Sequence, residues 1–189
     1  MRQDPSAASR QPPSPDDAAE QVRRVSERLA LLHYAFARSI IDALGPEDGR
    51  RLTMKAIKRY ASLIGEKVRA QVEARGLEAL PEQYAEDLPN VGMHRKLERV
   101  QVDGEPRTRV HGCVMGEVWQ ALDASELGAL YCLVDPAKMM AYNTDFKLVH
   151  HKSLPRGDAY CEFSIYPTTP EDREAFSAEE TDLARLDTP

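Results

Sequence analysis

The spacing of the apolar residues changes about halfway along the chain, and this change narrows the possible folds. In the first half, large apolar residues recur at steps of three and four, which is the period of an amphipathic helix. In the second half, short runs alternate apolar and polar residues, which is the period of a strand with one buried face. Helices followed by strands of this kind indicate an α+β fold.

Two helices are expected in the first half, forming an N-terminal helical hairpin. The first ends at Gly45-Pro46 and the second near Gly76, because glycine and proline are frequent at helix ends. Each helix has one apolar stripe, narrow enough to be buried within the chain. The stripes consist of Val22, Val25, Leu29, Leu32, Phe36, Ile40 and Leu44 in the first helix, and of Leu52, Ala56, Tyr60, Ile64, Val68 and Val72 in the second.

Four antiparallel strands are expected in the second half, as two β-hairpins with one helix inserted between them. The first hairpin turns at Asp103-Gly104, although Pro106 shortens the pairing beside the turn. The inserted helix covers residues 125–133, and Pro136 opens a short turn after it. The helices are expected to pack on one face of a four-stranded antiparallel sheet, with strands at 97–102, 107–115, 146–153 and 160–166.

A single domain is expected over residues 18–166, with a tail at each end. Residues 1–17 are rich in proline, serine and glutamine and contain no large apolar residue after Met1, which predicts a disordered tail. Residues 167–189 carry many carboxylates and are expected to form a solvated acidic tail, although one short helix could dock through Phe176, Leu183 and Leu186.

Charge and composition exclude several classes of partner. The 189 residues have a net charge of -6 and no basic stripe with interleaved aromatic residues, so a nucleic-acid partner is not expected. The N-terminus has no apolar stretch of the kind that a signal peptide or membrane span needs. We therefore expect a cytoplasmic protein with reduced thiols, no membrane partner and a small-molecule substrate.

Three cysteines, Cys113, Cys132 and Cys161, are the residues most suited to chemistry. An odd number of thiols cannot all form disulfides, so at least one is a buried apolar residue, a metal ligand or a reactive group. Structural zinc sites use cysteines in close pairs, and no such pair is present. We therefore expect no cofactor, with a distributed zinc site of the three cysteines and one histidine as the alternative.

One predicted strand carries an unusual polar face. Because side chains alternate along a strand, Arg109, His111 and Cys113 are expected to share a face. Such a face could hold a carboxylate and attack a carbon atom beside it. The alternative is an exposed sheet face with an unrelated cysteine.

Cys132 and Asp135 are three positions apart and face the same way if the helix continues. The thiolate would then be the nucleophile, and the carboxylate would orient a proton-transfer partner or act as a general base. A carboxylate raises the pKa of a nearby thiol, so a histidine or arginine is also needed. The alternative is that Cys132 fills a core position while Asp135 caps the following turn.

The other candidates lie on the last two strands. Cys161 alternates with Phe163 and Ile165 and is expected to face apolar surroundings as an inert thiol. His150 and His151 are adjacent and must face opposite ways, so at most one of them can join the site.

The order of these residues resembles that of the L-2-amino-thiazoline-4-carboxylic acid hydrolase family. The resemblance covers residues 18–166 and includes His33-Tyr34 in the first helix. It is carried by Cys113, Glu126-Leu127-Gly128, Tyr131-Cys132-Leu133-Val134-Asp135, Asn143 and Gly157-Asp158-Ala159-Tyr160-Cys161-Glu162-Phe163. Its specific part is the order of a Cys, then Cys-x-x-Asp, then Gly-Asp-x-x-Cys-x-Phe. It implies a hydrolase that opens a small cyclic amidine or thiazoline substrate to an N-carbamoyl product.

The resemblance also implies roles for the candidate residues. Either Cys132 or a water molecule deprotonated by Asp135 attacks the amidine carbon, and His111 transfers the proton. Cys113 belongs to the same catalytic group. Substrate binding is expected from Arg109, Asn143 and His150, with Arg109 on the carboxylate, and support for the site from Cys161 and Asp158.

Two other functions remain open. The Gly157 to Phe163 segment is also similar to vinyl-reductase-type small-molecule binding domains, some of which hold zinc with cysteines and an acidic residue. A non-catalytic protein that uses the helical hairpin as a dimer face is the third possibility. A homo-oligomer is expected with either catalytic or binding function.

Overall fold

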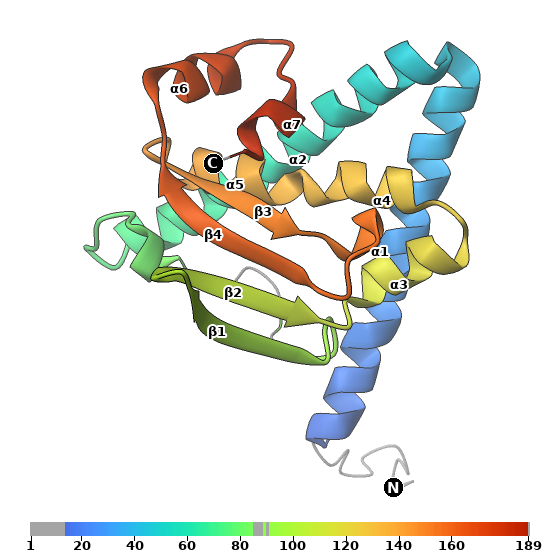
Figure 1. The fold of residues 1–189 in the computed structure, drawn as a ribbon, viewed down its shortest axis with the longest axis horizontal. Coiled ribbons are helices and arrows are strands. Elements are labelled where there is room, and N and C mark those ends of the chain that lie inside the picture. Colours follow the sequence, from blue (N-terminus) through green and yellow to red (C-terminus); the bar gives the residue numbers. More distant parts are fainter. Residues whose placement is uncertain (1–13, 85–88, 90, 189) are drawn as a thin grey trace, which may run out of the picture.

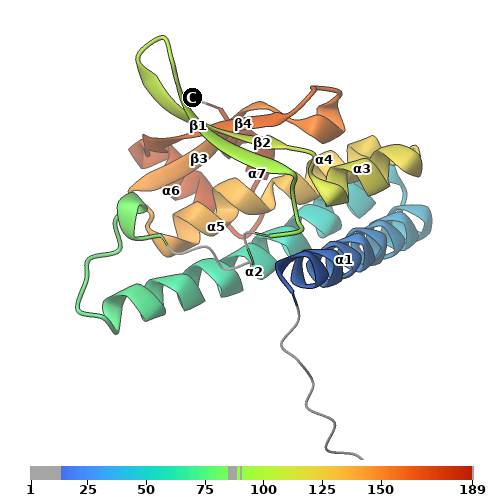
Figure 2. The same ribbon diagram turned by 90° about the horizontal axis from the view of Figure 1, so that it is seen from below.

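The computed structural model describes residues 14–84, 89 and 91–188. They form three layers: α1 and α2, then α3 to α5, then the sheet (Figure 2). None of the helices in these ranges is both long enough and apolar enough to cross a membrane. The elements are α1 Pro15–Leu44, α2 Pro46–Glu73, η1 Pro81–Gln83, β1 Lys96–Val102, β2 Glu105–His111, α3 Val114–Ala121, α4 Ser125–Cys132, α5 Val134–Tyr142, β3 Phe146–Lys152, η2 Leu154–Arg156, β4 Cys161–Pro167, α6 Pro170–Ser177 and α7 Leu183–Leu186.

The first two helices meet at a single residue and diverge from it as a V (Figure 1). Gly45 has φ of +83°, a backbone conformation that favours glycine, and Pro46 then starts α2. At the other end of α1, Ser14 accepts a hydrogen bond from the Asp17 backbone N–H in a capping box. Residues 15–17 of the expected tail are therefore the first turn of α1, and residues 1–13 lie outside the described residues.

The prediction that the α1 stripe is buried is wrong. Val25, Leu32 and Phe36 are 58%, 53% and 63% exposed, whereas the buried residues of α1 are Ser26, Ala30 and Ala37. Small residues on this side let α1 approach α3 closely, and the Trp119 indole N–H donates to the Ala30 carbonyl at 3.0 Å. The large apolar residues therefore lie on the opposite, outward side of the helix.

The second stripe is buried only towards its C-terminal end. Val68 and Val72 are buried as expected, but Leu52 and Tyr60 are 44% and 41% exposed. The buried face of α2 runs instead through Thr53, Ile57, Ala61 and Gly65, which pack on the middle layer of helices.

The sheet confirms the predicted α+β class and its antiparallel strands. Its strand order is β1-β2-β4-β3, so the two strand pairs join through β2 and β4. Val110 pairs with Cys161 and Arg109 with Glu162. Because alternate residues face opposite ways, Cys161 points towards the helices and Glu162 points to the outer face with Arg109.

Three helices, not one, connect β2 to β3. The strand expected to reach residue 115 ends at His111, since Gly112 turns the chain with φ of +64°. Cys113 is then the N-cap of α3, and Met115 belongs to that helix. Pro136 lies in the first turn of α5, where its missing N–H costs no helical hydrogen bond.

The C-terminal segment docks against the helices through α7. Leu183 and Leu186 are fully buried in the core that contains Ile57, Leu130 and Met140. Exposed carboxylates from the same segment pair with α2, for example Glu179 with Lys55 at 3.0 Å. The segment therefore contains both the docked helix that its apolar residues allowed and a solvated acidic part.

Gly65 fixes the distance between α2 and α5. A Cβ atom at this position would lie 2.4 Å from the Lys138 carbonyl oxygen and 2.8 Å from the Ala141 Cβ. The first of these neighbours is backbone and cannot move independently of α5. The glycine therefore sets the position of the helix that carries Asp135.

Gly65→Ala should destabilise the protein, although alanine is favoured over glycine within a helix by about 1 kcal/mol. We expect a net loss of about 1–3 kcal/mol, because the added methyl group overpacks the contact with α5. Urea unfolding followed by circular dichroism measures this. Glu66→Ala, at the exposed neighbouring position, is the control, and a Gly65→Ala variant more stable than wild type would contradict the argument.

Candidate active site

The three cysteines converge although they come from different elements. Cys113 caps α3, Cys132 ends α4 and Cys161 begins β4. The charge of Asp135 lies close enough to raise the pKa of each of the three thiols. One carboxylate and three thiols therefore share a single location between the helices and the sheet.

All three thiols are protonated at neutral pH in the free protein. Burial is the largest cause: it raises the pKa of Cys113, raises that of Cys132 well above its usual value, and raises that of Cys161 to about 11. A reactive thiolate therefore requires a positive charge that the free site does not supply to the sulfur atom.

Asp135 is the ionised group of this cluster. Burial favours its neutral form, but Lys138 at 3.2 Å and His150 at 3.4 Å outweigh that effect and lower the pKa of the Asp135 carboxyl to about 2. About a third of its side chain (33%) nevertheless remains accessible to solvent. The carboxylate is therefore partly exposed to solvent and stays charged throughout the physiological range.

His150 connects Asp135 to the C-terminal segment. Its Nε2 faces Asp135, while its Nδ1 lies 3.0 Å and its backbone N–H 2.7 Å from Asp187 Oδ1. Burial opposes a charge on the ring, but the two carboxylates prevail and raise the pKa of His150 to about 9. His150 is therefore an imidazolium between two carboxylates at neutral pH.

Asp187 is a residue of the site that sequence reasoning missed. Its side chain is 1% exposed and also accepts a hydrogen bond from Arg156 at 3.0 Å. No local pattern distinguishes it from the other carboxylates of the acidic segment. Only the docking of α7, directly before it, brings Asp187 to His150.

A short loop places a buried hydroxyl beside Cys132. Ser153 is 1% exposed, and its Oγ has no hydrogen-bond partner among the described residues. It is close enough to Cys132 to favour the thiolate form of that residue. The Asp158 carboxylate accepts the Ser153 backbone N–H at 2.8 Å, and the Cys161 sulfur accepts the Leu154 N–H at 3.3 Å. Asp158 and Cys161 thus hold the loop that carries Ser153.

Arg109 and His111 lie on the other face of the sheet from Cys161. Arg109 Nε donates to Glu162 at 2.6 Å, and His111 Nε2 lies 3.0 Å from Glu98. The expectation that Cys113 shares their face is wrong, because the turn at Gly112 takes Cys113 to the interior. The structure therefore separates Arg109 and His111 from Cys132 and Asp135.

Asn143 is the C-cap of α5, at the opposite end of this helix from Asp135. Its Nδ2 donates to the Ala79 carbonyl at 2.8 Å, and its Oδ1 accepts the Asp145 backbone N–H at 2.9 Å. Both side-chain polar atoms are thus engaged with backbone groups. This position favours a structural contribution, to the contact between α5 and the residues that follow α2.

A metal site was the alternative use of the thiols. In the part of the chain that the structure describes, no group of three or more histidine, cysteine, aspartate or glutamate side chains is arranged to hold a metal ion.

Asp187→Asn should destabilise the fold most strongly at acidic to neutral pH. Folding raises the pKa of His150, so its contribution is fully present below the unfolded value of about 6.5 and is lost as the pH rises through about 9. Removing one partner of a buried ion pair costs about 3 kcal/mol.

Urea unfolding of wild type and variant at pH 6 and at pH 9.5 measures this difference. The difference in the free energy of unfolding between wild type and variant should be smaller at pH 9.5 than at pH 6. Asp145→Asn is the control, because that carboxylate is 71% exposed and its ion pair with Arg173 is worth at most about 1 kcal/mol. An equal loss at both values of pH would contradict a charged His150.

One comparison with known proteins gives a family. The model of the L-2-amino-thiazoline-4-carboxylic acid hydrolase family matches residues 23–165, which is more than half of the 189-residue chain. No curated protein and no solved structure gives a significant match. The matched residues include the three cysteines, Asp135 and His150, and end before Asp187. The chain belongs to the L-2-amino-thiazoline-4-carboxylic acid hydrolase family.

Proposed function

We propose that the protein hydrolyses a small cyclic isothiourea of the L-2-amino-thiazoline-4-carboxylate type and releases an N-carbamoyl product with a free thiol. The observation that carries this proposal is the placement of an ionised, accessible Asp135 beside the Cys132 thiol in one cluster. The family membership supports the reaction class. The substrate and the product are our inference from the chemistry of these groups.

Asp135 is proposed to bind the amidine part of the substrate. A cyclic isothiourea is basic enough to be cationic at neutral pH, and a carboxylate accepts two parallel N–H bonds from such a group. With a pKa of about 2, Asp135 is a weak base but a permanent anion. Its role is therefore to hold and orient the cation next to the sulfur of Cys132.

Lys138 is proposed to bind the substrate carboxylate. It lies one helical turn after Asp135, and side chains at this spacing are about 5–6 Å apart at their Cβ atoms. A zwitterionic substrate carries its two charges at a comparable separation. It can therefore replace the Asp135–Lys138 ion pair with two ion pairs of its own.

Cys132 is proposed to attack the amidinium carbon atom. The bound cation supplies the positive charge that lowers the thiol pKa, which burial otherwise raises. The new bond joins Cys132 Sγ to the carbon, and the bond between that carbon and the ring sulfur breaks. The proton lost by Cys132 is balanced by the one that the departing ring sulfur gains.

Water then completes the reaction. Its oxygen adds to the same carbon atom, the bond to Cys132 breaks, and the Cys132 thiol is restored with one proton from the water. Since the cationic amidine becomes a neutral urea, one proton is released to solvent. Ser153 is placed to donate a hydrogen bond to the Cys132 sulfur as it leaves, because its hydroxyl has no other described partner.

His150 and Asp187 are proposed to position Asp135 and do not themselves react. The imidazolium holds the Asp135 carboxylate in one orientation, and Asp187 holds the ring. Arg109 and His111 have no part in the proposed mechanism, because they pair with Glu162 and Glu98 on the outer face of the sheet.

Cys132→Ala should lower turnover of L-2-amino-thiazoline-4-carboxylate by about 10³-fold or more, because it removes the nucleophile. The rate is measured by reaction of the product thiol with a chromogenic disulfide. Cys161→Ala is the matched control, since it removes another buried thiol of the cluster, and it should retain activity within about 10-fold.

Two results would contradict this mechanism. One is full activity of a folded Cys132→Ala variant, which would point to direct attack by water. The other is stoichiometric zinc held by the three thiols in the purified protein, which would favour the small-molecule binding alternative.

Lys138→Met should raise KM by about 10-fold or more with a smaller change in kcat, because the lost contact binds the carboxylate and not the reacting carbon. Steady-state kinetics provide both constants. A substrate analogue that lacks the carboxylate is the control, and its KM should not rise in the variant, because it makes no contact with Lys138 and no longer has to displace the Asp135–Lys138 ion pair. A Lys138→Met effect confined to kcat would contradict the assigned role.

A further inference from the structure

Most of the large apolar side chains that are exposed in the described part of the chain lie on α1 and α2. The two helices form the layer farthest from the sheet, so they have an outward face that points away from α3, α4 and α5 (Figure 2), although Leu29 also packs against the core cluster of Ala30, Met115 and Trp119. We call this outward face the α1–α2 face, formed by Val25, Leu29, Leu32, Phe36, Ile40 and Leu44 of α1 and by Leu52, Ala56, Tyr60 and Leu63 of α2.

The centre of this face is hollow. A groove of about 330 Å³ lies between the two arms of the V. Leu32, Phe36 and Ile40 line one side, Ala56 and Tyr60 line the other, and further lining residues include Tyr131 of α4. Phe36 is 63% exposed, so it forms part of the wall and also projects from the surface. The face thus offers both a projecting apolar side chain and an apolar hollow.

We propose that a second copy of this chain covers the α1–α2 face and forms a dimer with twofold symmetry. In such a dimer the same face is used by both subunits, so each Phe36 can enter the groove of the partner. A projection and a hollow on the same surface are what a self-complementary interface requires. The proposal is independent of the reaction at Cys132.

The size of the face fits a stable dimer. Helices of 30 and 28 residues are about 45 and 42 Å long, so strips one helix diameter wide cover roughly 900 Å² together. A standard interface buries about 800 Å² on each partner. The apolar stretches, from Val25 to Leu44 and from Leu52 to Leu63, occupy about half of the helix length. Polar residues beyond them form the rim that such interfaces usually have.

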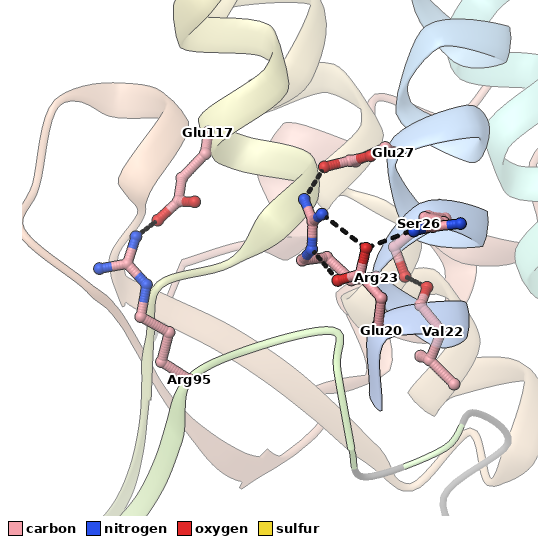
Figure 3. A network of polar contacts seen from close by, with 8 residues as sticks. Glu20, Val22, Arg23, Ser26, Glu27, Arg95 and Glu117 are labelled. Carbon is pink, nitrogen blue, oxygen red and sulfur yellow. Dashed lines mark hydrogen bonds and ion pairs between the residues drawn. The ribbon is translucent and has the colours of Figure 1, made fainter. Parts of the chain in front are cut away.

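The charges of α1 do not suggest a membrane as the occupant of this face, although α2 carries more lysine and arginine than carboxylates. Helices that lie on membranes carry a polar face rich in lysine and arginine. On α1, Arg23 pairs with Glu20 and Glu27 (Figure 3), and Arg38 lies 3.9 Å from Asp42. These arginines are neutralised within their own helix. The whole chain has a net charge of -6, which an anionic lipid surface would repel.

The sequence of the N-terminal residues offers little that could cover the face. Residues 1–13 contain no large apolar residue except Met1, so they offer almost nothing to bury against Leu32 and Phe36. A second copy, in contrast, brings ten apolar side chains of its own.

Analytical ultracentrifugation of the full-length wild-type protein from 1 to 100 µM tests the dimer. We expect a species of twice the chain mass of 21.2 kDa. Phe36→Glu should raise the dimer dissociation constant by about 30-fold or more, because it places two carboxylates in an apolar interface. Because Phe36 is mostly exposed within one subunit, the variant should keep the wild-type circular dichroism spectrum, which shows that the subunit still folds. Its urea midpoint should fall only by the stability that the dimer contact adds.

Leu97→Glu is the matched control. Leu97 is 40% exposed on β1, outside the α1–α2 face, and its substitution should leave the dissociation constant unchanged. A monomeric wild type, or a Phe36→Glu variant that remains a dimer, would overturn the proposal. Wild-type monomers that bind an apolar dye, or vesicles of phosphatidylcholine and phosphatidylserine, would assign the face to a ligand or to a membrane instead.

Discussion

The site depends on one buried cation held between two carboxylates. His150 on β3 lies between Asp135 of α5 and Asp187 of the C-terminal segment, with all three contacts at 3.4 Å or less. A buried charge without partners is very unfavourable, so each of these groups requires the others. The arrangement links the sheet, the middle helices and the last part of the chain. It also keeps Asp135 ionised and fixed beside Cys132, which is the condition that the proposed chemistry needs.

The fold could be predicted from the sequence where the signals are local. The turn at Asp103-Gly104 and the alternating runs beside it correctly indicate antiparallel strands, because register follows from neighbouring residues. The buried face of α1 could not be predicted in this way. One side carries large apolar residues and the other carries Ser26, Ala30 and Ala37, and it is the close approach of α3 that selects the small ones. Large apolar residues on a helix therefore do not by themselves identify its inner side when it packs through small residues.

The site was predictable to the extent that it depends on short spacings. Cys132 and Asp135 do lie close together, as their separation of three positions indicates. The alternation of side chains along the strand did not predict the position of Cys113, because Gly112, with its left-handed backbone conformation, reverses the direction of the following side chain. No sequence pattern identifies Ser153 and Asp187 as residues of the site, because their roles arise from contacts that tertiary packing creates. The family match ends at residue 165 and so leaves out a carboxylate that the geometry of the matched residues depends on.

The docking of α7 also has a consequence for the order in which the protein is completed on the ribosome. Asp187 is synthesised 37 positions after His150, an interval of roughly 2–7 s at 5–20 residues per second. During that interval β4, which joins β3 to β2, is also made, and the imidazole of His150 has only Asp135 of its two anionic partners. The charges around His150 are therefore not balanced until the C-terminal segment docks. Full rigidity of the site comes only with the segment that is made last among the described residues.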